Sequence, residues 1–369
     1  MRRHSFSFLL LSPLLTSSHG ANLFVSHYSG TVYTLTLSNN SDGAYSLTLN
    51  TSLYIGGQPS WLTWDSSTRT LYIPDETEYF GTPNAWSVAA ATNGALSLTG
   101  KATAIGGGVA NTLYGNHQYL ATAHYDLSQI TTFKLPLTSS STPLQKIALN
   151  MTGPGTVPNR QNAAHPHEVL LDPTGAFLLV PDLGADQIRI YQIGSTGLLT
   201  ACPSYFELGG TGPRHGAFSA NGSILYVANE LSNSVHTFGM AYNNSRITLK
   251  KLQSLTTFPK NATAPTGTKV AEVHVKDNFI YAANRNDLSF SPSDSIASFS
   301  LNSVGLMAFM NITSSGGWHP RTFDINKAGD MIAIGDQTSA NVAIVKRNIT
   351  TGELGPQLAS LRVSTVGTA

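Results

Sequence analysis

Short apolar runs separated by polar turns recur along the chain at intervals of about 50 residues. Each unit has a Pro- or Gly-containing entry, an apolar strand, a turn with Asp or Asn and Gly, and a second apolar strand that ends in a polar residue. The six units are PSWLTWDSSTRTLYIPDE from Pro59, VANTLYGNHQYLATAHYD from Val109, HPHEVLLDPTGAFLLVPDLG from His165, GPRHGAFSANGSILYVANEL from Gly212, KVAEVHVKDNFIYAANRND from Lys269 and HPRTFDINKAGDMIAIGDQ from His319. A third strand follows each pair, and a fourth, more variable strand follows the third.

Four short antiparallel strands in units of this length are typical of propeller blades. With ANLFVSHYSGTVYTLTLS after residue 20 as a further unit, the sequence predicts an all-β fold, a single seven-bladed β-propeller over residues 21–369. We expect a strand from the C-terminal end to complete the first blade and close the ring, which removes exposed sheet edges. Helical periodicity is almost absent, which argues against α/β folds, and the coils of a β-helix are much shorter than these units.

Residues 1–20 have the pattern of a signal peptide. A basic start at residues 2–4, an apolar core at residues 6–15 and small residues before Ala21 fit this pattern. The apolar core is too short to span a bilayer, and no later stretch is long enough. We therefore expect a mature protein without a membrane anchor, located in the secretory pathway or outside the cell.

Asn-x-Ser/Thr sequons occur at eight positions, which behind a signal peptide favours a glycosylated protein of a eukaryotic secretory route. The candidate glycosylation sites are Asn39, Asn50, Asn150, Asn221, Asn243, Asn261, Asn311 and Asn348. Cys202 is the only cysteine, so no internal disulfide can form. We interpret Cys202 as a buried small residue rather than a reactive thiol.

Charged residues make up only 11% of the chain, with 21 Lys and Arg against 20 Asp and Glu. The basic excess that would neutralise nucleic-acid phosphates is missing, which argues against nucleic-acid binding. The chain is also too apolar for a disordered protein. The expected partner is a small molecule, and the protein itself is expected to be a monomer or a weak oligomer.

The polar residues of the units concentrate at two positions that a propeller brings to one face. In a blade, the innermost strand begins where the second strand ends, so both points lie at the same mouth of the central channel. The starts of inner strands carry His165, His167, Arg214, His215, His319 and Arg321. The ends of second strands carry Asp75, Glu76, Asp182, Glu230, Arg285 and Asp336. Because ligand sites favour such mouths, the sequence predicts a site here.

Within this set, His167 titrates near neutrality and suits acid–base catalysis, and Glu230 takes the complementary role if the pocket raises its pKa. Arg214 and Arg285 are the expected catalytic cations, with planar forks that fit a carboxylate or phosphate. The expected substrate-binding residues include His165, Arg321, Glu76 and Asp182. The alternative interpretation is that these side chains form ion pairs between blades.

Motif searches identify neither a metal site nor a cofactor site. His165-Pro-His167 has no third ligand at metal-binding spacing, and GGG at 106–108 lacks the lysine and helix of a phosphate-binding loop. The acidic segment at 182–186 has no downstream Glu at the spacing of a calcium loop. A Gly-x-Ser-x-Gly elbow is absent. We therefore predict no metal and no cofactor.

Four segments resemble the seven-bladed lactonase-type propellers: HPHEVLLDPTGAFLLVPDLGADQIRIY, GPRHGAFSANGSILYVANEL, AEVHVKDNFIYAANRND and HPRTFDINKAGDMIAIGDQ with the later TGEL. That group includes fungal carboxy-cis,cis-muconate cyclase and the propeller-type 6-phosphogluconolactonases. The resemblance covers nearly all of the chain after residue 21. PSWLTWD with LYIPDE is more similar to the fungal cyclase branch, and the unit at 109–126 is the poorest match.

The resemblance implies active-site residues at His167, Arg214, Glu230 and Arg285, and it adds Glu272 to the expected substrate-binding residues. In the cyclase, a substrate carboxylate adds to a carbon–carbon double bond to form a lactone, and a proton is delivered to carbon. Lactonase members run the related ring opening with water. For this chain the resemblance implies that Arg side chains hold carboxylates and that His167 or Glu230 supplies the proton.

Three functions stay open, because a signal peptide conflicts with the intracellular substrates of these enzymes. The first is a ring-forming enzyme of fungal secondary metabolism, similar to the hetero-Diels–Alderases that join a tropolone-type quinone methide to a sesquiterpene such as humulene. It predicts apolar walls at the mouth. The second forms or hydrolyses a lactone on a small carboxylated substrate, and predicts a narrow pocket where Arg214, Arg285 and Arg321 converge. The third is a non-catalytic secreted glycoprotein, in which His167 and Glu230 are dispensable.

Overall fold

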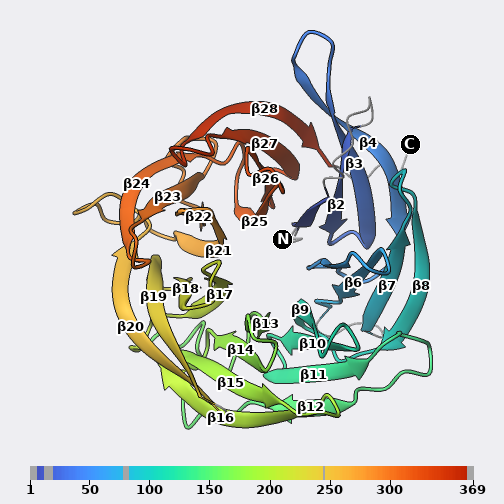
Figure 1. Ribbon diagram of the computed structural model, residues 1–369, viewed down its shortest axis with the longest axis vertical. Helices are drawn as coiled ribbons and strands as arrows, with labels where there is room; N and C mark the ends of the chain where they lie inside the picture. The colour runs from blue at the N-terminus through green and yellow to red at the C-terminus, as the bar shows by residue number, and fades with distance from the viewer. Residues whose placement is uncertain (1–5, 12–19, 78–82, 244–245, 364–369) are drawn as a thin grey trace.

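The computed structural model describes residues 6–11, 20–77, 83–243 and 246–363. These residues form seven antiparallel sheets of four strands each, arranged side by side as a ring with the first strand of each sheet innermost (Figure 1). The described ranges contain no helix, and therefore none long and apolar enough to cross a membrane. The predicted all-β, seven-bladed propeller is confirmed.

Each blade follows chain order from the centre of the ring outwards. Blades 1 to 3 comprise β1 (Phe6–Leu11), β2 (Ala21–His27), β3 (Thr31–Asn39), β4 (Tyr45–Tyr54), β5 (Thr63–Asp65), β6 (Thr70–Pro74), β7 (Asn84–Ala90), β8 (Leu96–Thr103), β9 (Gly108–Tyr114), β10 (Tyr119–His124), β11 (Gln129–Lys134) and β12 (Gln145–Ala148). Blades 4 and 5 comprise β13 (Leu170–Leu171), β14 (Phe177–Asp182), β15 (Gln187–Ile193), β16 (Leu199–Phe206), β17 (Pro213–Phe218), β18 (Ile224–Asn229), β19 (Ser234–Asn243) and β20 (Arg246–Thr256). Blades 6 and 7 comprise β21 (Lys269–Lys276), β22 (Phe279–Arg285), β23 (Ser295–Leu301), β24 (Met307–Ser314), β25 (Pro320–Ile325), β26 (Met331–Asp336), β27 (Asn341–Arg347) and β28 (Leu354–Arg362).

Burial explains why the second strand of a unit is so apolar and the fourth so variable. Strands β14 and β18 read FLLVPD and ILYVAN, and all of their residues are buried because neighbouring blades cover both faces. The outer strand β20 alternates between buried and exposed residues, as expected for a strand with one face in water. The repeated strand pairs predicted from sequence are therefore the two inner strands of blades 2 to 7.

Blade 1 differs from the sequence prediction. Its inner strand, β1, pairs antiparallel with β2 from Phe6↔His27 to Leu11↔Asn22, and it also lies beside β25 and β26 of blade 7. The last strand, β28, is the outermost strand of blade 7, so the prediction that a C-terminal strand completes blade 1 is wrong. Strand β1 lies within the predicted signal peptide, whose residues 1–5 and 12–19 fall outside the described residues. A chain cleaved before Ala21 would lack this strand.

Blades 7 and 1 are joined by a continuous apolar cluster. Val25 and Leu35 of blade 1 pack with Val342 and Ile344 of blade 7, and all four side chains are fully buried. Burying aliphatic side chains of this size stabilises a fold by about 1.5–3 kcal/mol each. The ring therefore closes through side-chain packing between two complete blades.

Cys202 differs from its expected environment. It lies on the outer strand β16, is only partly buried, and makes no disulfide. Its side chain packs at the edge of the apolar cluster that blades 4 and 5 share. The interpretation as a fully buried residue is therefore wrong, because outer strands keep one face accessible.

Candidate active site

One pairing position recurs at the same end of the blades. In four blades the opening position, at or a few residues before the start of the inner strand, is a proline that pairs with a residue at or just after the end of the second strand. These pairs are Pro59↔Asp75, Pro166↔Asp182, Pro213↔Asn229 and Pro320↔Asp336. Proline suits this place because it lacks an N–H and is tolerated at the first residue of a strand. The shared register allows the residues that follow to be compared between blades.

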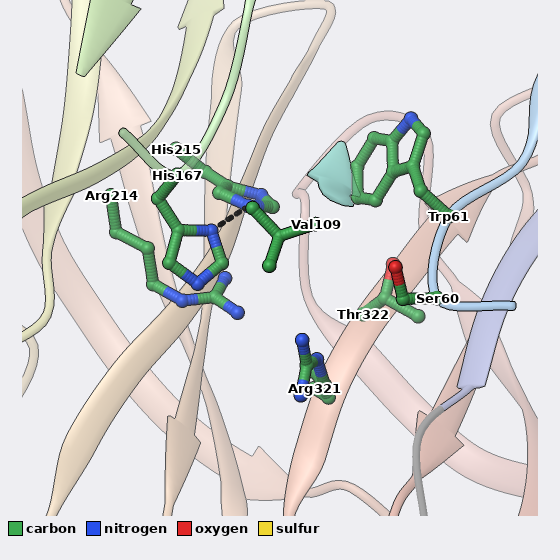
Figure 2. Close-up of a pocket in the computed structure, with 8 residues that line it drawn as sticks. All are labelled: Ser60, Trp61, Val109, His167, Arg214, His215, Arg321 and Thr322. Atoms are coloured by element: carbon green, nitrogen blue, oxygen red, sulfur yellow. Dashed lines mark hydrogen bonds between the residues drawn. The ribbon is translucent and has the colours of Figure 1, made fainter. Parts of the chain in front are cut away.

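The two residues after the opening position supply a pocket at the centre of the ring. In blades 5 and 7 the register shifts after Pro213 and Pro320, so that Arg214 and Arg321 are the extra residues of β-bulges. A bulge bends the strand and re-aims its side chains. The pocket is narrow, and Figure 2 shows the side chains that line it. Its lining residues are Ser60, Trp61, Val109, His167, Arg214, His215, Arg321 and Thr322.

Beside the pocket, Glu230 gathers three guanidinium groups. Its Oε1 lies 2.6 Å from Nη2 of Arg160, and its Oε2 lies 3.0 Å from Nε of Arg214 and 2.7 Å from Nη2 of Arg285. Burial acts to raise the pKa of Glu230, but Arg285, Arg160 and Arg214 together hold it well below its usual value. The condition for Glu230 to take the complementary acid–base role, a raised pKa, is therefore not met, because Glu230 stays ionised and anchors the cations.

His167 and His215 form a hydrogen-bonded chain with Glu272. Nδ1 of His167 lies 3.1 Å from Nε2 of His215, and Nδ1 of His215 lies 3.0 Å from both carboxylate oxygens of Glu272. All three side chains are buried. Burial and the charge of Arg214 hold the pKa of His167 well below its usual value, and burial lowers the pKa of His215 to about 4. Both imidazoles are therefore neutral near pH 7.

Arg321 reaches the pocket from blade 7. Its Nη2 lies 2.9 Å from Oε2 of Glu76, and its guanidinium lies over the ring of Tyr28 at 5.6 Å. Burial acts to lower the pKa of Arg321, but Glu76 and Tyr28 raise it, so the group stays charged. Figure 2 shows this guanidinium pointing into the space between His167 and Thr322. Arg321 is thus placed to meet a negative charge in the pocket.

Of the five expected substrate-binding residues only Arg321 lines the pocket, and His165, Asp182, Glu76 and Glu272 lie outside the lining. Both ring nitrogens of His165 bond to protein groups, Nδ1 to the carbonyl of Tyr125 at 2.9 Å and Nε2 to Asn162 at 3.2 Å. Asp182 accepts hydrogen bonds from the backbone of His165 at 2.7 Å and from Arg189 at 2.8 Å. His165 thus links the segment before blade 4 to blade 3, and Asp182 holds the turn of blade 4.

Several residues of the site carry no signal that the sequence analysis used. Arg160 lies in the long connection between β12 and β13, which has no counterpart in the other units. Trp61 packs edge-on against His215 with ring centroids 5.2 Å apart. Three further residues occupy the first or second position after the opening proline, as His167, Arg214 and His215 do. They are Ser60, Trp61 and Thr322. Comparing the units column by column would have found these three, whereas nothing in the pattern points to Arg160.

The charged groups around the pocket leave one net positive charge. They are the guanidiniums of Arg160, Arg214, Arg285 and Arg321 and the carboxylates of Glu76, Glu230 and Glu272. Burial and Arg285 lower the pKa of Arg214 to about 9, so Arg214 is still charged at pH 7. Burial and the charge of Glu272 raise the pKa of Glu168 well above its usual value, which favours its neutral form. The arrangement fits an anionic ligand.

A metal site is not indicated in the described part of the chain, which holds no group of three or more His, Cys, Asp or Glu side chains arranged around a common point. The chemistry open to the pocket is acid–base catalysis by imidazole together with stabilisation of negative charge by guanidinium groups.

Comparison with known proteins places this pocket in a family. Residues 22–368 match the family described as lactonase, 7-bladed beta-propeller. The chain belongs to this family. A probable 6-phosphogluconolactonase of Arthroderma benhamiae is 28% identical to this lactonase propeller over 366 residues, 98% of this chain and 91% of that protein. A 6-phosphogluconolactonase of Formosa agariphila is 28% identical over 244 residues, 64% of this chain and 66% of that protein.

Solved structures share the fold of this lactonase propeller. The periplasmic gluconolactonase of Pseudomonas aeruginosa matches with a TM-score of 0.78 and 23% identity, covering 99% of this chain and 97% of that one. A putative 6-phosphogluconolactonase of Bacteroides fragilis matches with a TM-score of 0.75 and 21% identity, covering 98% of each chain. At these identities the likeness establishes the fold alone. The family resemblance drawn from the sequence is confirmed.

Proposed function

We propose that this lactonase propeller hydrolyses a small, negatively charged lactone, with phosphorylated or carboxylated sugar lactones as the substrate class. The observation that carries the proposal is a neutral imidazole, His167, in a narrow pocket that Arg214 and Arg321 also line. Attack by water on a lactone carbonyl needs a base, and a neutral imidazole is one. The guanidiniums supply the charge that the anionic substrate and the developing oxyanion require.

The proposed reaction has two proton transfers, both through His167. A water molecule loses a proton to Nε2 of His167 while its oxygen bonds to the lactone carbonyl carbon. The carbonyl oxygen becomes an oxyanion that Arg214 stabilises, while Arg321 binds the anionic group of the substrate. The ring C–O bond then breaks, and the leaving alkoxide takes the proton from the imidazolium, which restores neutral His167. The product is an open-chain hydroxy acid, whose carboxyl proton is released to solvent.

The names of the relatives support this substrate class. The relatives from Arthroderma and Formosa carry the names probable 6-phosphogluconolactonase and 6-phosphogluconolactonase. The lining of the pocket points the same way, because most of its side chains are polar or charged and only Trp61 and Val109 among them are apolar. A cycloaddition between a tropolone-type partner and a sesquiterpene would need room for two large apolar molecules. We therefore propose lactone hydrolysis rather than ring formation.

Secretion and glycosylation stay predictions from the sequence. Seven of the candidate asparagines are exposed, as glycan attachment requires, and Asn311 on β24 is only partly exposed. This accessibility is compatible with the proposed secretory route. Mass measurement of the purified protein before and after glycosidase treatment, with N-terminal sequencing, tests both predictions.

A substrate panel tests the proposal directly. Acid release by the full-length protein is followed with 6-phosphogluconolactone, uncharged gluconolactone and a carboxylated muconate, each against its uncatalysed rate. We expect hydrolysis of the phosphorylated lactone with kcat/KM at least about tenfold above that of the uncharged lactone, because a charge-assisted hydrogen bond contributes about 1.5–3 kcal/mol. Rates equal to the uncatalysed ones for both lactones would overturn the proposal, and lactone formation from the muconate alone would replace it with the cyclase reaction.

A matched pair of arginine variants sharpens the test. Arg321→Gln removes the guanidinium that faces the pocket and should abolish the preference for the phosphorylated lactone. Arg189→Gln removes a guanidinium that pairs with Asp182 away from the pocket and should leave the preference unchanged. Equal effects of the two variants would show that Arg321 is not a substrate contact.

A further inference from the structure

The hydrogen-bonded chain from Glu272 to His167 crosses three blades. His167 precedes β13 of blade 4, His215 lies on β17 of blade 5, and Glu272 lies on β21 of blade 6. The two links measure 3.1 Å between the imidazoles and 3.0 Å from His215 to the carboxylate. Only His167 and His215 of these three line the pocket. Glu272 is therefore a buried group that the proposed reaction does not use directly.

The backbone and a hydroxyl fix the orientation of Glu272. The N–H of Val273 donates to Oε1 at 3.1 Å, and Oγ1 of Thr322 donates to Oε2 at 3.4 Å. His274 lies 3.8 Å from Oε1 on the exposed side. The other charged or titratable groups that act on the two imidazoles and on Glu272 are Arg214, Arg285, Arg321 and Glu168. Both carboxylate oxygens thus present lone pairs to His215.

This geometry determines which ring nitrogens of His167 and His215 carry a proton. A carboxylate only accepts, so Nδ1 of His215 must carry its proton. A neutral imidazole has one N–H, so Nε2 of His215 accepts, and Nδ1 of His167 must carry a proton to donate to it. If His215 were instead protonated on Nε2, the lone pair on its Nδ1 would face two carboxylate oxygens at 3.0 Å, which is repulsive.

The consequence falls on the other nitrogen of His167. With its single proton on Nδ1, Nε2 carries a lone pair. Within the described residues the side chain of His167 makes one hydrogen bond, through Nδ1, so Nε2 is available to a ligand in the pocket. A lone pair at this point is what a base needs, whereas the other tautomer would present an N–H.

We propose that Glu272 and His215 are positioning residues that hold His167 in the tautomer protonated on Nδ1, so that Nε2 faces the substrate as the base. The proposal rests on the proposed lactone hydrolysis for its effect on rate, but the tautomer itself does not depend on any substrate. It assigns Glu272 a role through His215 and removes it from the set of expected substrate contacts.

Nitrogen NMR of the full-length protein labelled with ¹⁵N-histidine tests the tautomer without a substrate. Protonated and unprotonated ring nitrogens resonate in well-separated ranges, and the His167→Asn and His215→Asn variants assign the signals among the 11 histidines. We expect protonated Nδ1 and unprotonated Nε2 for both residues at pH 7. A protonated Nε2 on His167 overturns the proposal, whatever the enzyme does.

The Glu272→Gln variant tests the functional consequence. Its amide can donate to Nδ1 of His215, which reverses the chain and places a proton on Nε2 of His167. We expect kcat to fall about 10²-fold with KM changed less than about threefold, since a general base contributes about 10²–10⁴-fold. The NMR signals of His167 should shift to the other tautomer in the same variant. A kcat within threefold of wild type, or a loss of kcat with the wild-type tautomer retained, contradicts the proposal.

Glu207→Gln is the matched control. Glu207 makes the same kind of contact with Nδ1 of His236, at 2.7 Å, but this pair lies outside the pocket lining. The control should keep wild-type kcat and the wild-type tautomer of His167. If wild-type protein hydrolyses no lactone but shows the expected tautomer, the proposed function fails and the inference about the chain survives. If it hydrolyses lactones with the other tautomer, the inference fails and the function survives.

Discussion

Asp182 and Glu230 are both acidic residues at the end of a second strand, but they belong to different regions of the molecule. Asp182 is the residue that pairs with the opening proline of blade 4, and it binds the turn of its own blade. Glu230 follows the corresponding residue of blade 5, Asn229, and it binds arginines from several parts of the ring. Asp182 and Glu230 are therefore one position apart in the repeat. This difference places the carboxylate of Asp182 at a turn and that of Glu230 beside the pocket.

The difference comes from strand geometry. Successive residues of a strand point to opposite sides, so the residue at the pairing position and the next residue cannot share an environment. Glu76 and Arg285 occupy the same position as Glu230 in blades 2 and 6, and both make ion pairs beside the pocket. Acidic residues at the pairing position itself, such as Asp75, accept backbone N–H groups of the local turn.

The largest effect is expected for Glu230→Gln. Removing the charge leaves three guanidiniums uncompensated, and breaking a buried ion pair costs about 3–5 kcal/mol. We expect the free energy of unfolding to fall by about this amount and kcat/KM to fall about 10²-fold or more, measured by denaturant titration and by lactone hydrolysis. Glu353→Gln, at an exposed turn, is the control and should change neither. If Glu230→Gln left the free energy of unfolding unchanged, Glu230 would not be compensating the three guanidiniums, and it would not differ from Asp182 in the way described.

Asp182→Asn should affect stability without affecting turnover. The amide keeps one acceptor but loses the ion pair with Arg189, whose Nε lies 2.8 Å away. We expect the free energy of unfolding to fall by about 1–3 kcal/mol, with kcat/KM per folded molecule unchanged. A tenfold loss of kcat/KM in the folded variant would place Asp182 in the active site after all.

The buried histidines should make the protein less stable in acid. Burial lowers the pKa of His124 to about 4, below the usual 6.5, and outweighs the hydrogen bond to the Gly106 carbonyl, which acts to raise it. Because the folded pKa is lower, the unfolded chain binds the proton first, and stability present above pH 6.5 is lost as the pH falls towards 4. The loss from His124 is about 3 kcal/mol.

Denaturant titrations between pH 7 and pH 4.5 measure this loss, and His124→Gln should flatten the pH dependence of the unfolding free energy. This effect should appear without any change in the pocket, since His124 does not line it. The same slope in the variant as in wild type would show that other groups carry the acid sensitivity.

Thr322→Val should have the smallest effect. Its hydroxyl donates only a long hydrogen bond to Glu272, 3.4 Å, and valine has nearly the same shape. We expect kcat to fall about twofold at unchanged KM, because a weak neutral hydrogen bond contributes about 0.5 kcal/mol. A fall of tenfold or more would mean that Thr322 itself contacts the reacting groups.

Most of the fold could be predicted from sequence because the inner strand pairs repeat with the same turn chemistry. The position of β1 could not, since an apolar run such as Phe6–Leu11 has the same composition as the core of a signal peptide. Nothing in its residues says that it pairs with β2. The closing strand was therefore assigned to the wrong end of the chain.

Part of the site could also be predicted from sequence. His167, Arg214 and Arg321 stand out because polar residues follow a proline at a repeated position. Arg160 could not be found this way, since it lies in an irregular connection, and its role depends on a 2.6 Å contact with Glu230. The ionisation state of Glu230 could not be predicted from sequence either, because the sign of its pKa shift depends on how many guanidiniums surround it.

The most direct test of the account compares wild-type protein with His167→Gln in the hydrolysis of 6-phosphogluconolactone. Glutamine keeps a polar side chain of similar size but has no basic nitrogen. The account predicts that kcat/KM falls about 10²–10⁴-fold in this variant, while Asp182→Asn, measured in parallel, keeps the wild-type value. A His167→Gln variant within about twofold of wild type would contradict the claim that a neutral His167 is the base of this lactonase propeller.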